Sequence, residues 1–263
     1  MSLAEDNRPP LAVDPDTPRG RWHVEVVAVT ESTNADVAER FRRGEGEGLV
    51  LVAEDQTAGR GRLGRDWVTR PQSSLTVSFL VVPPDLDPER WPWLPLVTGL
   101  AAVAAVRRVT GLPVGCKWPN DVMVGGKKVG GILLERVERG EEAAAVIGIG
   151  LNCHQTTEEL PVPGATSLDL ETGDQVDRTA LLEALIAEVA TQLHQWAGGA
   201  DLRPAYRQQC TTVGQEVRVE VPGGQVTGQA VDIDDGGRLV VRTATGEEAL
   251  GAGDVVHVRP VQD

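Results

Sequence analysis

The chain has 263 residues, of which 41% are hydrophobic and 24% are charged, and these values exclude collagen, a coiled coil and a wholly disordered protein. Lysine and arginine total 25 against 39 acidic residues, so the formal net charge is −14. This charge disfavours nucleic acid and anionic membranes as partners, and an anionic ligand would need a local basic patch.

Cysteine usage and the lack of targeting signals indicate a soluble, cytoplasmic protein. The three cysteines lie far apart and form no CxxC pair, which is typical of a reducing compartment and argues against a disulfide framework or a cysteine zinc site. No basic segment followed by an apolar run opens the sequence, so we expect no signal peptide. The longest apolar stretch, Trp91–Val106, contains two prolines and is shorter than the roughly 20 residues of a membrane-spanning helix.

The first four-fifths of the chain predicts a flexible tail followed by one α+β domain. Residues 1–20 contain four prolines and no apolar period, which indicates the tail. Apolar periodicity then predicts strands at 23–29, 49–53, 74–82, 114–118, 121–124, 127–135 and 143–152, and helices at 32–44, 94–109 and 179–196. Because strands and helices mix without a regular βαβ rhythm, we expect an α+β domain over residues 21–211.

Residues 212–263 predict a second, smaller domain of β structure. Short valine-rich runs at 217–221, 226–233, 238–243 and 255–258 are separated by glycine and aspartate turns. This segment contains no Phe, Trp or Tyr, so we expect no aromatic groove for proline-rich peptides.

The segment EDQTAGRGRLGRDW, residues 54–67, carries a formal match to the GxGxxG dinucleotide fingerprint. A dinucleotide site of that type needs a strand that runs straight into the glycines and a helix that leaves them. Here five residues follow the strand before Gly59, and the segment after Trp67 contains Pro71 and no helical period. We therefore reject a dinucleotide-binding interpretation.

What remains is a basic loop in an acidic protein. Arg60, Arg62 and Arg65 have no acidic residue between them, and guanidinium groups suit phosphate and carboxylate ligands. The loop is also compatible with a solvated surface segment or an RGG-like nucleic-acid segment, but its single occurrence between buried strands favours an anionic small molecule. Three glycines within six residues lead us to expect a loop that closes over its ligand.

The pentapeptide KWPND, residues 117–121, is the second segment that suggests chemistry. Strand alternation places Lys117 on the face opposite Trp118, and the proline leaves Asn120 and Asp121 at the end of the strand. Ligand contacts and a simple turn function are both compatible with this pattern.

Small and polar residues recur at three other places. The triplet Ser32-Thr33-Asn34 consists of preferred helix caps, and the same groups suit a polar ligand head. The glycine pair that follows Lys128 and the GIG sequence at 148–150 indicate close approach of a ligand or of another chain segment.

Taken together and in this order, these segments resemble the biotin protein ligases. The similarity runs through EST-N, EDQTAGRGRLGRDW, KWPNDV, GKKVGGILLE and GIGLN, over about residues 25–155, with a weaker echo at 164–168. The resemblance implies a catalytic domain with a mixed sheet, related to class II aminoacyl-tRNA synthetases, and an SH3-like C-terminal barrel. Because the catalytic pattern begins near residue 25 and the charge is −14, we expect a monofunctional form without an N-terminal DNA-binding domain.

The resemblance further implies roles for individual residues. The biotin contacts would be Ser32, Thr33, Asn34, Gln56, Arg60, Gly61, Arg62 and Lys128. The contacts to ATP or the adenylate would be Arg62, Arg65, Trp67, Asn120 and Asn152. Lys117 and Arg62 would be catalytic, at the reacting carboxylate and α-phosphate, whereas Lys127 has no such match and is expected to be solvated. The sequence does not identify which residues would hold the metal ion.

The implied activity is ATP-dependent formation of biotinyl-5′-AMP, followed by transfer of biotin to a lysine of a biotin carboxyl carrier domain. Biotin, ATP and Mg²⁺ are the expected small molecules, and we expect a monomer or weak homodimer. A lipoate–protein ligase, a biotin-responsive repressor and a non-catalytic biotin-binding module are the alternatives. The GRGRLGRDW and KWPND pair argues against the first, and the acidic charge and the early start of the catalytic pattern argue against the second.

Overall fold

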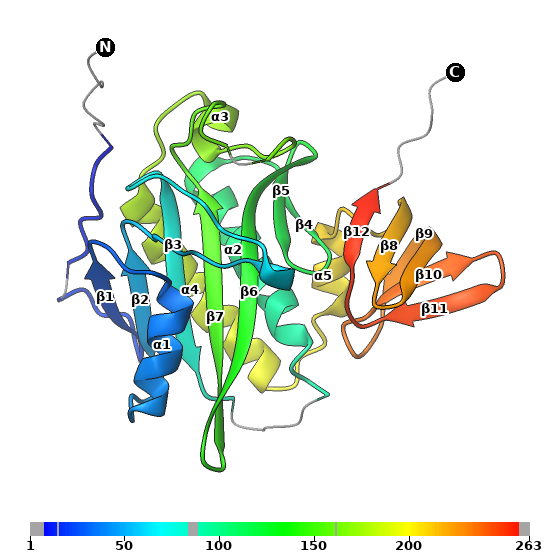
Figure 1. Ribbon diagram of the computed structural model, residues 1–263, viewed down its shortest axis with the longest axis horizontal. Coiled ribbons are helices and arrows are strands. Elements are labelled where there is room, and N and C mark those ends of the chain that lie inside the picture. The colour runs from blue at the N-terminus through cyan, green and yellow to red at the C-terminus, as the bar shows by residue number, and fades with distance from the viewer. Residues whose placement is uncertain (1–7, 15, 84–88, 161, 258–263) are drawn as a thin grey trace.

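The computed structural model describes residues 8–14, 16–83, 89–160 and 162–257 (Figure 1). The larger domain is built on a seven-stranded sheet with the order β1-β2-β3-β7-β6-β5-β4. Its strands are β1 (His23–Val27), β2 (Leu49–Ala53), β3 (Ser74–Val81), β4 (Val114–Lys117), β5 (Asp121–Val124), β6 (Lys127–Arg139) and β7 (Glu142–Asn152). Strands β1 and β2 are parallel and the other neighbours are antiparallel, so the sheet is mixed as expected.

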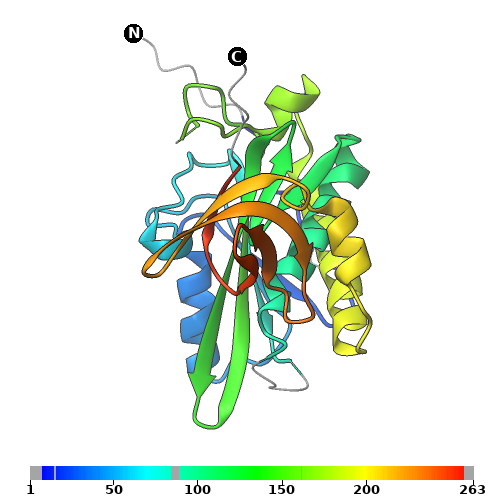
Figure 2. The same ribbon diagram turned by 90° about the vertical axis from the view of Figure 1, so that its right-hand side faces the viewer.

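Helices cover both faces of this sheet. Helix α1 (Thr33–Arg42) lies on one face, and α2 (Trp93–Thr110) and α4 (Arg178–Ala197) pack together on the other, as Figure 2 shows. The short helices are η1 (Arg62–Gly64), α3 (Leu168–Thr172) and α5 (Arg203–Gln209). The mixed sheet with helices on both sides confirms the α+β prediction for the larger domain.

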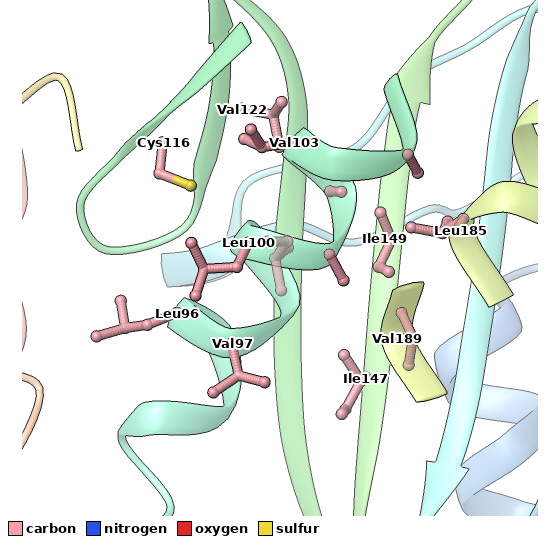
Figure 3. Packing of buried hydrophobic residues seen from close by; sticks show 14 of the residues in the cluster. Leu96, Val97, Leu100, Val103, Cys116, Val122, Ile147, Ile149, Leu185 and Val189 are labelled. Atoms are coloured by element: carbon pink, nitrogen blue, oxygen red, sulfur yellow. The ribbon is translucent and has the colours of Figure 1, made fainter. Parts of the chain in front are cut away.

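Each face of the sheet has its own hydrophobic cluster because strand residues alternate between the faces. On β2, Val50 and Val52 join the cluster beneath α2 and α4, whereas Leu49 and Leu51 join the cluster beneath α1. Helix α2 packs against α4 and against β4, β5 and β6. Figure 3 shows side chains of this core from α2, from the sheet and from α4, among them Leu96, Val97, Leu100, Val103, Ile147, Ile149, Leu185 and Val189. Helix α2 is apolar and long enough to span a membrane, but 67% of it is buried in this core.

The α1 face of the sheet changes character along strands β3 and β7. Near the middle of the sheet, Leu80 and Val146 are apolar and belong to the α1 cluster. Further along the same face, beyond the N-terminus of α1, the register pairs Ser78 with Gly148, Thr76 with Gly150 and Ser74 with Asn152. Small and polar side chains replace large apolar ones there, and this substitution leaves room for a ligand above the sheet.

The smaller domain is a five-stranded antiparallel sheet with the order β11-β10-β9-β8-β12. Its strands are β8 (Glu216–Val221), β9 (Gly224–Ile233), β10 (Leu239–Thr243), β11 (Gly246–Leu250) and β12 (Asp254–His257). Two indole groups of the larger domain donate to a turn of the smaller one: Trp118 Nε1 to Gly237 O at 3.0 Å and Trp93 Nε1 to Asp235 O at 2.6 Å. These bonds attach the small domain beside β4, at the right of Figure 1.

The structure differs from the sequence predictions at three kinds of position. Strand β6 extends beyond residue 135 to Arg139, where it forms a projecting hairpin with β7. Helices α3 and α5 and strand β11 were not expected, because the helices are short and β11 has no buried residue to give an apolar alternation. The described part of residues 1–20 is bound to the domain rather than free, since Arg19 pairs with Glu183 of α4 at 2.6 Å. Residues 1–7 and 15 lie outside the described chain.

Candidate functional site

A cavity of about 380 Å³ lies on the α1 face of the sheet, next to strand β12 of the small domain. The structure brings all of the residues proposed from the sequence into its lining: Ser32, Thr33, Asn34, Gln56, Arg60, Gly61, Arg62, Arg65, Trp67, Lys117, Asn120, Lys128 and Asn152. The segments that contribute them are spread over residues 32–152 of the chain. The fold therefore produces one site from the separate motifs.

One end of the cavity is neutral and is formed by the start of helix α1. Ser32 is the N-cap, and its hydroxyl accepts the Ala35 N–H at 3.5 Å. Gln56 Oε1 accepts the Thr33 N–H at 2.8 Å, so the loop after β2 supplies a second cap. The triplet that begins with Ser32 therefore has both functions considered from the sequence: it caps the helix and it lines the cavity.

A chain of hydrogen bonds orients the amide of Asn34. Ser78 Oγ lies 2.7 Å from Thr33 Oγ1 and 2.6 Å from Asn34 Oδ1. Because Asn34 Oδ1 can only accept, Ser78 donates its single proton to that oxygen. The Thr33 hydroxyl has one proton for two neighbouring acceptors, Ser78 Oγ and, at 3.0 Å, Gln56 Oε1. Asn34 Nδ2 donates to Glu135 Oε2 at 2.7 Å. A Cβ atom on Gly148 would lie 2.3 Å from Asn34 Oδ1, so only glycine leaves room for this arrangement.

The basic loop, residues 54–67, follows β2 and folds over the cavity. Trp67 N–H donates to Gly59 O at 2.8 Å, and Gly61 N–H donates to Arg65 O at 2.7 Å. Leu63 at the tip has a positive φ of 57° and a side chain that is 73% exposed. The loop is therefore closed by its own backbone, and its arginine side chains are free to project in different directions.

Each arginine of the basic loop contacts a different part of the molecule. Arg62 Nη1 donates to Asn120 Oδ1 at 2.9 Å. Arg65 Nη2 pairs with Asp254 Oδ2 of the small domain at 3.0 Å, and Arg60 Nη1 lies 3.7 Å from Glu135 Oε1. The loop is thus connected to the turn after β4, to strand β12 and to strand β6.

Arg62 is the most strongly desolvated of these cations. Burial lowers its pKa, although the negative charges of Asp121 and Asp254 oppose that effect, and the nearby Arg65 adds to it. A guanidinium group remains protonated in proteins despite such a shift. A buried cation beside another cation is stabilised when an anion arrives, so this position suits a phosphate or carboxylate.

Two lysines complete the cationic end of the cavity. Lys128 Nζ pairs with Asp121 Oδ1 at 2.6 Å, whereas Lys117 has no ion pair among the residues that the structure describes. The alternation predicted for this strand is confirmed: Trp118 is buried and Lys117 is half-buried at the cavity. Burial, together with the charge of Lys117, lowers the pKa of His257 on β12. Lys127 is exposed, as expected.

The indole of Trp67 lies on glycines of β6 and β7. A Cβ atom on Gly150 would lie 2.5 Å from Trp67 Cε2, and one on Gly131 would lie 3.5 Å from Trp67 Cζ3. Trp67 Nε1 is buried and has no hydrogen-bond partner within the described part of the chain. The close approach predicted for these glycines is therefore made by another segment of the chain, which places an aromatic ring in the cavity.

Asn152 connects the cavity to the loop that follows β7. Its Nδ2 donates to Thr166 O at 3.0 Å, and its Oδ1 accepts from Gln155 Nε2 at 3.2 Å. Val162 and Ala165 of the same loop also line the cavity. The side-chain amide of Asn152 is thus already used to fold this loop over the site.

Several functional positions were not identified from the sequence. Ser78 and Glu135 hold Asn34, and Asp254 reaches the cavity from the small domain. The alternation of Ser74, Thr76 and Ser78 with apolar neighbours on β3 was a usable signal, because a strand beneath a helix normally carries large apolar residues on that face. No local signal marks Asp254.

The arrangement suits a ligand with an uncharged polar head and an anionic tail. Neutral hydrogen-bonding groups lie at one end, and arginine and lysine side chains lie at the other, with an indole between glycine-lined strands. Among the described residues there is no group of three or more His, Cys, Asp or Glu side chains that could hold a metal ion. The three cysteines are buried and none of them lines the cavity, so the site offers no cysteine nucleophile. Burial also raises the pKa of Cys153 to about 12.

Comparisons with known proteins agree with this chemistry. Residues 26–152 match the Biotin/lipoate A/B protein ligase family, and residues 212–258 match the Biotin protein ligase C terminal domain. The chain is 42% identical to the Biotin–[acetyl-CoA-carboxylase] ligase of Mycobacterium tuberculosis, over 91% of each protein. It is 34% identical to the enzyme of the same name from Paracoccus denitrificans, over 88% of this chain and 98% of that one. The structure of a biotin protein ligase from Aquifex aeolicus in complex with biotin and ATP is similar, with a TM-score of 0.78 at 30% identity, over 90% of this chain and 98% of that one.

Proposed function

This chain belongs to the biotin protein ligase family, and we propose that it is an ATP-dependent biotin–[acetyl-CoA-carboxylase] ligase. The observation that carries this proposal is that one cavity has a neutral end, whose polar groups are already hydrogen-bonded to one another, and a cationic end. Biotin has an uncharged ureido head and a carboxylate tail, so it fits this polarity in one orientation. The family resemblance inferred from the sequence is confirmed by these relatives.

In the first half-reaction, a carboxylate oxygen of biotin attacks the α-phosphorus of ATP. The bond from the α-phosphorus to the bridging oxygen breaks, and pyrophosphate leaves with the electron pair. Lys117 and Arg62 project into the cationic end, where they offset the charge that spreads over the phosphate oxygens. The neutral end, with Thr33, Asn34 and Gln56, holds the ureido group. This division assigns binding to one end and catalysis to the other.

In the second half-reaction, the neutral amine of a carrier lysine attacks the acyl carbon of biotinyl-5′-AMP. The amide bond forms, AMP leaves, and the amine loses its proton to solvent. The mixed anhydride is sensitive to water, so the basic loop has a chemical purpose when it covers the cavity. No nucleophilic residue of the enzyme is required.

The nucleotide would occupy the space beside Trp67, with its phosphates toward Arg62 and Arg65. Magnesium fits as part of the MgATP substrate, held chiefly by phosphate oxygens. Within the described part of the chain, the carboxylates that line the cavity are those of Asp66, Asp121 and Asp254, and the last two are paired with Lys128 and Arg65. One or two carboxylates with phosphate oxygens are a usual environment for this ion.

The protein substrate that we propose is the carrier domain of acetyl-CoA carboxylase, as in the two named relatives. We also propose that the ligase acts in the cytoplasm as a monomer or weak homodimer. Its negative charge and buried α2 helix accord with a soluble enzyme that uses neither nucleic acid nor membrane.

Radiolabelled pyrophosphate exchange into ATP tests the proposed activation step. We expect exchange only when biotin is present, since the adenylate forms reversibly before the carrier is needed. Lipoate in place of biotin is the matched control and should give no exchange. Biotin binding without exchange would show that the protein is a non-catalytic binding module, and exchange with lipoate would indicate a lipoate ligase.

A further inference from the structure

The N-terminal segment crosses the surface next to both loops that border the cavity. We call residues 8–12 the N-terminal strap. Ala12 N–H donates to Thr179 Oγ1 of α4 at 3.0 Å, and Arg8 pairs with Glu159. Strap residues thus bond to segments that lie more than 140 residues further along the chain.

Glu54 connects the strap to the base of the basic loop. This residue directly follows β2, and its Oε1 accepts the Leu11 N–H at 2.5 Å. Its backbone carbonyl accepts the Gln72 N–H at 2.7 Å, so Glu54 also joins the two ends of the segment that contains the basic loop. The strap therefore bonds to the residue at which the loop leaves the sheet.

Arg178 provides the charge that holds Glu54 in place. Its Nη2 lies 2.8 Å from Glu54 Oε2, and the two side chains are only 2% and 12% exposed. The same guanidinium donates to Ser74 O at 3.0 Å and to Pro9 O of the strap at 2.7 Å. Removal of one partner from a buried ion pair is costly, and the strap adds two hydrogen-bond partners to this pair, the Leu11 N–H and Pro9 O. Arg178 Nε has no hydrogen-bond partner within the described part of the chain, so the pair depends on these strap contacts.

Glu159 connects the strap to the second loop. This residue lies in the loop that follows β7, which lines the cavity through Val162 and Ala165. Its carboxylate contacts Arg8 of the strap and Arg70 Nε at 3.1 Å, and it accepts its own loop's Thr156 N–H at 3.1 Å. Arg70 comes shortly after the basic loop, so this one carboxylate joins the strap, the segment after the basic loop and the loop after β7.

We infer that the N-terminal strap is a positioning element for the ligase reaction: through Glu54 and Glu159 it holds the two loops that cover the ligand cavity. The inference rests on the proposed function for its catalytic part. Strap residues do not line the cavity, so they act on ligands only through the loops. Loss of the strap contacts should weaken the binding of biotin and ATP and leave the chemical step nearly unchanged.

Two matched pairs of full-length variants test this inference. Arg8→Gln removes the contact to Glu159, and Arg19→Gln removes a strong pair with Glu183 that touches neither loop. Leu11→Pro removes the N–H that Glu54 accepts, and Leu11→Ala keeps that N–H while it removes the side chain. Each pair separates the loop contact from a general loss of packing.

The first measurement is hydrogen exchange of the ligand-free proteins, followed by mass spectrometry over the two loops. We expect exchange about three- to tenfold faster in Arg8→Gln and Leu11→Pro than in their controls, because hydrogen bonds to charged partners are being lost. The second is carrier biotinylation, in which KM for biotin and ATP should rise by about the same factor while kcat stays within about twofold.

Equal exchange rates in test and control variants would overturn the inference, as would faster exchange with unchanged KM values. If Leu11→Pro does not fold, as judged by thermal unfolding, the Arg8→Gln and Arg19→Gln pair decides alone. The two proposals are distinguishable, because an inactive wild-type protein would refute the ligase assignment while the exchange data would still show whether the strap orders the loops.

Discussion

The two ends of the cavity differ in whether their polar and charged groups already have partners within the protein. At the neutral end, Thr33, Ser78 and Asn34 satisfy one another's hydrogen bonds and end on Glu135, so the orientation of each group is fixed before a ligand arrives. At the cationic end, Lys117 has no ion pair within the described residues, and Arg62 remains desolvated beside another cation.

This difference indicates how binding and catalysis are divided. A preformed network recognises a rigid head group without reorganisation, and it contributes equally to the ground state and the transition state. A cation that lacks a partner gains most when negative charge develops next to it, and it therefore acts on the rate. Changes at the neutral end should appear in KM for biotin, and loss of the unpaired Lys117 at the cationic end should appear in kcat.

The largest effect is expected at Lys117. Lys117→Ala should reduce the rate of adenylate formation by about 10²–10³-fold, because one preorganised donor at a developing charge is worth that much. Lys117→Arg should restore little activity, since a planar guanidinium does not replace a compact ammonium. Single-turnover formation of biotinyl-AMP measures this step apart from transfer of chemically made biotinyl-AMP.

Lys127→Ala is the matched control for Lys117, because it removes an exposed lysine nearby that pairs with Glu171 outside the cavity. Its rate should equal that of the wild type. A wild-type rate of activation in Lys117→Ala would remove the lysine from the mechanism and would contradict the division between the two ends.

The second largest effect is expected at Trp67, which lies between the ends. Trp67→Ala should raise KM for ATP by about 5- to 150-fold and largely spare biotin, because stacking on a base contributes ~1–3 kcal/mol. Gly150→Ala should act in the same direction, since a Cβ atom there would displace the indole from its position on the sheet.

Trp67→Phe keeps an aromatic face and is the control for this prediction. Initial rates over a range of ATP and biotin concentrations separate the two Michaelis constants. Should the loss in Trp67→Ala fall on biotin alone, the indole would belong to the neutral end and not to the nucleotide site.

A smaller effect is expected at Ser78. Ser78→Ala leaves Asn34 Oδ1 without its donor, and the cost of a buried unsatisfied group, ~1–3 kcal/mol, corresponds to about fivefold or more in KM for biotin. The value of kcat should change little, because Ser78 lies at the end of the cavity away from the reacting carboxylate. Isothermal titration with biotin alone gives an independent measure.

Thr98→Ala is the control for Ser78→Ala, since it removes another buried hydroxyl that bonds only to Leu94 O within α2. Both variants should lose some stability, but only Ser78→Ala should bind biotin more weakly. Equal biotin affinities would mean that the hydroxyl chain merely stabilises the fold.

The smallest effect is expected at the exposed pair of Arg65 and Asp254. Both side chains are about half exposed, at 56% and 48%, so the pair contributes only ~0.2–1 kcal/mol. Asp254→Asn releases Arg65 for phosphate, and KM for ATP should fall by about 1.5- to 5-fold at low salt. The difference should vanish at high ionic strength, because screening weakens the pair. A rise in KM would show that Asp254 contributes to nucleotide binding instead.

Much of the secondary structure could be predicted because its signals are local. Strands 49–53 and 121–124 have the expected bounds, and Asp177 caps α4 as its position before an apolar period suggests. The described part of residues 1–20 could not be predicted in this way. Its proline-rich composition indicates a tail, yet Glu54 and Glu159 bind it from distant parts of the chain.

The sequence by itself determined the family, the two-part organisation and many of the residues that line the cavity, because the motifs of this chain carry them in short, continuous segments. Only the tertiary structure decided how those residues are held. Ser78 and Glu135 bond to Asn34 across 44 and 101 residues of sequence, and Asp254 meets Arg65 from the other domain. A local sequence pattern cannot predict these contacts, because they form only after the sheet, the loops and the small domain have packed together.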